Sequence, residues 1–151
     1  MPTVTLEKFF LGKLFAVPPY QRDYAWTQRN VDDLLEDLSE AIESSTTHYI
    51  GTFVLSQAAA DGRYKIVDGQ QRLTTLTMLI SVLTRQLPPQ QGALRDFFTP
   101  LFLRDIEGGW RLSLLGTNEQ FFRRLMEDDN PDPTTPGQER MKAAYQWIKQ
   151  R

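Results

Sequence analysis

The feature that most constrains the fold is the stretch 64–87, where a strand pattern runs through a glycine turn directly into a long helix pattern. The run "YKIV" is typical of a strand, and the Asp-Gly pair after it indicates a turn. The following helix is expected from about Gln70 to Leu87. Because apolar residues cover most of its circumference, this helix should be buried. The fold must therefore bury a helix that begins directly after the strand and its glycine turn.

The first turn of this helix carries residues suited to an anionic ligand. Unpaired backbone N–H groups at a helix N-terminus attract phosphate, and Gly69 lets a ligand approach the backbone closely. The guanidinium of Arg72 can fork two phosphate oxygens. Gln70 and Gln71 offer donors and acceptors to a base, a sugar or a phosphate, and Asp68 could hold Mg²⁺ directly or through water. This combination indicates a phosphate site.

The same residues also allow a plain structural interpretation. Asp-Gly is a common turn, Asp68 could cap the helix through the N–H of Gln70 or Gln71, and Arg72 could be a surface residue. The pattern is not a Walker A loop, since no Gly-Lys-Ser/Thr follows. Taken alone, these residues leave both interpretations open.

A second polar cluster lies in "PPYQRDYAW", residues 18–26. An arginine flanked by aromatic residues after a strand can line a nucleotide pocket, which makes Tyr20, Gln21 and Arg22 candidates. The alternative is that the aromatic side chains are core and that Arg22 pairs with an acidic neighbour. The lone His48 at a strand start has a weaker case, whereas Gly51 inside the expected strand suggests a close approach of backbone or ligand.

The remaining elements are predicted from periodicity and capping signals. We expect a short helix over 6–11, a strand over 14–18, and a surface helix after Thr27 or Asn30 that packs on a sheet through Val31, Leu34, Leu35, Leu38 and Ile42. Strands over 49–57 and 63–67 should form an antiparallel hairpin. The second half should be mainly helical, with a short strand within 108–115 and a capping box formed by Thr117 and Gln120.

Composition excludes several classes of function. The chain has 151 residues, no cysteine and one histidine. Disulfides, zinc–thiolate sites, cysteine nucleophiles and polyhistidine metal sites are therefore excluded. A formal net charge of −2 argues against strong DNA binding by this segment alone. Neither a membrane span nor a signal peptide is evident, so we expect a cytoplasmic protein. The last helix pattern stops without a cap, so we expect the native chain to continue past Arg151.

Three segments together resemble a known family. "FAVPPYQRDYAW", "HYIGTFVL" and "YKIVDGQQRLTTLTMLI" are similar, in order and spacing, to the N-terminal domain of GmrSD-type restriction endonucleases. The resemblance covers 6–87, and its Asp-Gly-Gln-Gln-Arg motif is highly specific. It implies an α+β fold like that of ParB and sulfiredoxin, with a small mixed sheet packed with helices. We expect 1–87 to form this nucleotide-binding core and 88–151 a helical extension.

The resemblance also implies a function. GmrS-like domains are expected to bind and hydrolyse GTP or ATP with Mg²⁺ and to regulate DNA cleavage in bacterial defence against phage, often directed at modified DNA. An HNH-type nuclease domain, further along the full-length chain or in a partner, would perform the cleavage, because one histidine excludes an HNH signature here. DNA would be contacted through other domains, and a homodimer is left open.

Site residues follow by position from the same resemblance. Asp68 and Arg72 are expected to be catalytic, with Asp68 also the metal ligand, and the nucleotide would be bound by Gln21, Arg22, Gly69, Gln70, Gln71 and Arg72. Tyr20, His48 and Gly51 match with less defined roles. Two alternatives remain: a non-catalytic module that senses a nucleotide or modified DNA, and a ParB-like domain that nicks DNA itself.

Overall fold

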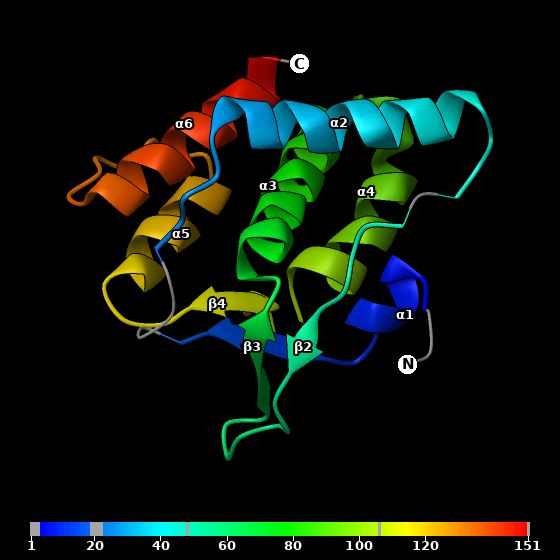
Figure 1. Cartoon of the computed structure of the whole chain (residues 1–151). Helices are drawn as coiled ribbons and strands as arrows, with labels where there is room; N and C mark the ends of the chain where they lie inside the picture. Colours follow the sequence, from blue (N-terminus) through cyan, green and yellow to red (C-terminus); the bar gives the residue numbers. More distant parts are fainter. Residues whose placement is uncertain (1–3, 19–22, 48, 106, 151) are drawn as a thin grey trace.

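A computed structural model describes residues 4–18, 23–47, 49–105 and 107–150 (Figure 1). Its sheet has the strand order β2-β3-β1-β4, formed by β1 (Leu14–Val17), β2 (Val54–Leu55), β3 (Arg63–Asp68) and β4 (Leu112–Leu114). The central strand β1 is parallel to both β3 and β4, whereas β2 is antiparallel to β3. The expected α+β fold with a small mixed sheet is confirmed, and so is the hairpin, although β2 is much shorter than predicted.

Helix α3 (Gln70–Gln86) rises from the sheet into the centre of the molecule (Figure 1). Only Gly69 separates it from β3, and this residue has a φ of 97°, a left-handed conformation that glycine adopts without steric cost. The helix buries Leu73, Leu76, Met78 and Val82 in the core. The prediction of a buried helix directly after a strand and a glycine is therefore confirmed.

The core is shared by both halves of the chain. Its buried residues include Phe15 and Ile66 from the sheet and also side chains from α5 (Asn118–Met126) and α6 (Pro136–Gln150). The boundary expected at Leu87 falls between α3 and the short 3-10 turn η1 (Pro89–Gln91). Beyond it, β4 completes the sheet next to β1, and α6 packs against α3. Residues after the boundary thus cover elements that precede it.

The other helices surround this centre. They are α1 (Leu6–Phe10), α2 (Gln28–Glu43), α4 (Gly92–Phe98) and the π-helical turn η2 (Thr99–Leu103). Thr27 caps α2 in a capping box with Asn30, as the sequence allows. However, α2 packs on α6 at the end of the molecule away from the sheet, so the expected packing on a sheet is wrong (Figure 1). In consequence Ile42 is 77% exposed.

The capping box predicted for α5 is also wrong. Thr117 occupies the N-cap position with helical φ and ψ of −66° and −19°, and its side chain makes no capping hydrogen bond. An N-cap side chain reaches the first N–H groups from an extended backbone, and the helical backbone of Thr117 prevents this. Separately, in the part of the chain that the structure describes, no helix is both long enough and apolar enough to cross a membrane.

Candidate functional site

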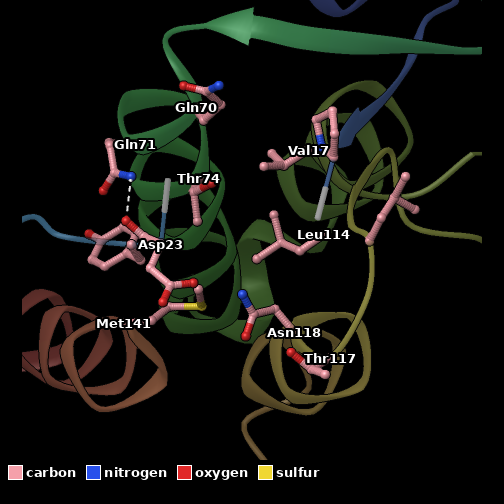
Figure 2. A pocket seen from close by; sticks show the side chains of 12 residues that line it. Val17, Asp23, Gln70, Gln71, Thr74, Leu114, Thr117, Asn118 and Met141 are labelled. Carbon is pink, nitrogen blue, oxygen red and sulfur yellow. Dashed lines mark hydrogen bonds between the residues drawn. The ribbon is translucent and has the colours of Figure 1, made fainter. Parts of the chain in front are cut away.

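A pocket lies where β1 and β4 end, beside the first turns of α3 and α5 (Figure 2). Its walls come from five parts of the chain. They are Val17 and Pro18 at the end of β1, Asp23 and Tyr24, the α3 residues Gln70, Gln71 and Thr74, the residues Leu114, Leu115, Thr117 and Asn118 from the end of β4 to the start of α5, and Met141 on α6. Parallel strands present their carboxyl ends at one edge of a sheet, and ligands of open parallel sheets bind at that edge. The pocket is thus the candidate site of this fold.

Gln71 fastens one wall of the pocket. Its Nε2 donates to the carbonyl of Asp23 at 3.0 Å, and its Oε1 accepts from the N–H of Ala25 at 2.7 Å. This side chain therefore pairs with the backbone of 23–25 as a neighbouring strand would. Because both the oxygen and the nitrogen of the amide form hydrogen bonds with this backbone, Gln71 fixes the position of residues 23–25.

Tyr24, between those two residues, is held by its side chain as well. Its hydroxyl lies 2.7 Å from Oγ1 of Thr75, which itself donates to the carbonyl of Gln71 at 2.8 Å. The Tyr24 O–H is therefore the donor in its bond to Thr75. Burial raises the pKa of Tyr24 to about 12, so the phenol is neutral at physiological pH.

Gln70 has a similar positioning role at the end of β3. Its Nε2 donates to the carbonyl of Val67 at 3.1 Å and to that of Ile66 at 3.3 Å. These bonds hold the Gln70 side chain against the last residues of β3. The backbone N–H groups of Gln71 and Arg72 have no hydrogen-bond partner among the residues that the structure describes, so the helix end can receive an acceptor.

Arg72 lies on the other side of the first turn of α3 and does not line the pocket. At about 100° per residue, positions 70, 71 and 74 share one face of a helix and position 72 points away from it. A Cβ built on Gly51, whose φ is 127°, would lie 2.5 Å from Nη1 of Arg72. The guanidinium carbon lies 5.9 Å from the centre of the Phe53 ring. The structure thus brings Arg72 together with Gly51.

Phe53 also contacts the turn that starts α3. A Cβ at Gly69 would lie 2.5 Å from Cδ1 of Phe53, so the ring needs a glycine there. The same ring lies 5.0 Å from that of Phe9, which stacks on Phe15 of β1. A chain of aromatic contacts therefore connects the core with the guanidinium of Arg72. Sequence reasoning missed Phe53, since a phenylalanine in a strand pattern carries no signal beyond the core.

Asp68 ends β3 and is exposed. The N-cap of α3 is Gly69 and has no side-chain capping bond, so the alternative role of Asp68 as the helix cap is not the arrangement found. Among the described residues, no group of three or more acidic or histidine side chains could hold a metal ion. A single exposed carboxylate fits only a Mg²⁺ ion that is bound mainly by water and substrate phosphates.

Tyr20, Gln21, Arg22 and His48 lie outside the described residues. Pro18 and Asp23, which flank the first three of them in the sequence, both line the pocket. Sequence reasoning missed Thr74, Leu114 and Asn118 as pocket residues. Asn118 reaches the site only through the pairing of β4 with β1, and no local pattern reports that pairing.

Comparison with known proteins identifies a family. The family described as "GmrSD restriction endonuclease, N-terminal domain" matches residues 6–150. No curated protein matches the chain.

Proposed function

The chain belongs to the GmrSD N-terminal domain family, which makes it a component of a restriction system, and we propose that it is the nucleotide-binding regulatory domain of that system. In this proposal it binds GTP or ATP with Mg²⁺ and hydrolyses the nucleotide. The observation that carries the proposal is the open N-terminus of α3, which lies between the pocket and Arg72 at the carboxyl edge of parallel strands. Helix ends in this position bind phosphate in many nucleotide-binding folds.

The phosphates would be bound by the helix end and by Arg72. The free N–H groups of Gln71 and Arg72 point along the helix axis, and the helix dipole adds partial positive charge there. The guanidinium of Arg72, half-buried against Phe53, would neutralise phosphate charge as it develops during hydrolysis. Bound Mg²⁺ would offset further phosphate charge, and Asp68 is the described carboxylate that would hold it.

Removal of the Arg72 guanidinium tests this assignment. We expect Arg72→Ala to weaken binding of GTP and ATP by at least about 10-fold, because a charged hydrogen-bond donor to phosphate contributes about 1.5–3 kcal/mol. Isothermal titration calorimetry in Mg²⁺ measures the affinity. The matched control is Arg29→Ala, since Arg29 is exposed on α2 and far from α3 in sequence. Equal affinity of wild type and Arg72→Ala would refute the site.

A non-catalytic nucleotide sensor is the second candidate. It is favoured by one observation, that Asp68 stands without a cluster of further metal-binding side chains among the described residues. Phosphate release from GTP and ATP in Mg²⁺ separates the two candidates. Turnover that is lost in Asp68→Asn supports hydrolysis, whereas tight binding without turnover supports the sensor.

A further inference from the structure

The polar lining of the pocket does not suit a phosphate. In the described part of the chain, no lysine or arginine lines it, and its one charged side chain is the carboxylate of Asp23. A phosphate placed there would meet like charge and no cation. The other polar side chains that line it are neutral amides and hydroxyls. Its apolar residues are Val17, Pro18, Leu114, Leu115 and Met141. Such a lining suits a neutral group that carries hydroxyls.

Thr74 provides an unused hydroxyl inside this lining. Its side chain is only 3% exposed and points from α3 toward the pocket (Figure 2). The neighbouring threonines of the helix satisfy themselves, since Thr75 donates to the carbonyl of Gln71 and Thr77 to that of Leu73. The Thr74 hydroxyl has no hydrogen-bond partner within the described residues. Because no buried side-chain oxygen or nitrogen among the described residues lacks a partner, this hydroxyl is open to the pocket, where a ligand can bond it.

Asn118 faces the pocket in a fixed orientation. Its Oδ1 accepts from Nε2 of Gln138 at 3.1 Å, and Gln138 is 2% exposed. The oxygen of Gln138 in turn accepts from the N–H of Thr134 at 2.9 Å and from its hydroxyl at 3.1 Å. This network fixes both amides, so Asn118 presents its Nδ2 donor to the pocket, toward the carboxylate of Asp23 (Figure 2).

We propose that this pocket binds the ribose of the nucleotide through its 2′ and 3′ hydroxyls. A vicinal diol has two donors and two acceptors at short spacing, which matches an acceptor (Asp23), a donor (Asn118 Nδ2) and a hydroxyl (Thr74) around a small space. The cavity volume of about 80 Å³ cannot enclose a whole nucleotide. The inference rests on the proposed function, in which the phosphates lie at the end of α3 and at Arg72.

The inference predicts discrimination between ribonucleotides and 2′-deoxyribonucleotides. Loss of the 2′ hydroxyl would remove a hydrogen bond that the sugar donates to the carboxylate of Asp23. We therefore expect the wild-type protein to bind GTP or ATP at least about 10-fold more tightly than the 2′-deoxy form. Titration calorimetry with each pair of nucleotides, in Mg²⁺, measures the ratio.

Two variants test whether the preference for the ribonucleotide over the 2′-deoxyribonucleotide comes from the pocket. Asp23→Ala and Thr74→Val should each lower the ratio toward one, and Thr74→Val should leave thermal stability unchanged because its hydroxyl bonds nothing. The matched control is Thr77→Val on the same helix, which removes a hydroxyl that bonds Leu73 and should leave the ratio unchanged. Equal affinity for both sugars overturns the inference and leaves the proposed function standing. Absence of binding to any nucleotide overturns both.

Discussion

At the scale of single residues, Gln71 has backbone partners that the sequence did not predict. The motif assigned it to the nucleotide, and the structure bonds its amide to the backbone of Asp23 and Ala25. A motif reports which residues occur together, and their orientation depends on partners far along the chain. The helix pattern could predict that position 72 points away from positions 70, 71 and 74, but it could not predict that Gly51 and Phe53 receive the arginine.

Tyr24 gives a pH prediction. Its pKa is raised from 10.0 to about 12 in the folded protein, so the unfolded chain releases the phenol proton first as the pH rises. The contribution of Tyr24 to the free energy of unfolding is therefore complete below pH 10 and is lost between about pH 10 and 12. The total loss should be at most about 2–3 kcal/mol. Urea unfolding of the wild type and Tyr24→Phe across this range measures it.

The variant should lose less stability than the wild type as the pH rises. Tyr145, whose pKa burial also raises to about 12, remains in both proteins and cancels in the comparison. Parallel loss of stability in the two proteins would contradict a buried neutral phenol at position 24.

At the scale of elements, local sequence patterns predicted those helices, strands and turns that depend only on residues close in sequence. The turn at Gly12, the strand 14–17, the hairpin and α3 follow from residues within a few positions of each other. The packing of α2 could not be predicted in this way. Its apolar stripe identifies a face to bury, and α6, which covers that face, begins almost a hundred residues later in the chain.

Arg63 of β3 bonds the backbone of β1 and of the residues just before β4, and its loss gives a prediction for stability. Its guanidinium donates to the carbonyls of Phe15 and Trp110, both at 2.9 Å, and to that of Arg111 at 3.3 Å. Because Arg63→Ala removes the donor to the carbonyls of Phe15 and Trp110, whereas the carbonyl of Arg111 keeps the N–H of Phe15, we expect a loss of about 2–4 kcal/mol in the free energy of unfolding. Chemical denaturation measures the change.

Lysine should not restore this stability, since one ammonium cannot match a planar fork of donors. The matched control is Arg123→Ala, which removes an exposed ion pair with Glu119 and should cost less than about 1 kcal/mol. Similar losses at both positions would contradict the role of Arg63 in the sheet.

At the scale of the whole molecule, β4, α5 and α6 belong to the same core as the first half. We therefore expect a fragment of residues 1–87 to lack cooperative unfolding, because it would expose the β4 side of β1 and the face of α3 that α6 covers. Circular dichroism with urea, and the dispersion of amide proton signals in NMR spectra, measure this.

The intact chain is the control for that fragment. A cooperative transition and dispersed signals from 1–87 alone would establish it as an independent folding unit and contradict the shared core. The boundary at Leu87 was predicted because the resemblance to the family covered 6–87, whereas the family model matches residues 6–150. The three residues of β4 are too few for a pattern to reveal that they extend the sheet.

The division of the first turn of α3 into two sides has a consequence for ligand size. The pocket lies on the side of Gln71 and Thr74, and the guanidinium lies on the side of Gly51 and Phe53. Under the proposed function, a nucleoside alone would occupy one side and pyrophosphate alone the other, each weakly and independently. The covalent bond that joins them in a nucleotide would supply a high effective concentration for the second contact. The site would thus bind a nucleotide much more tightly than it binds the separate nucleoside or pyrophosphate.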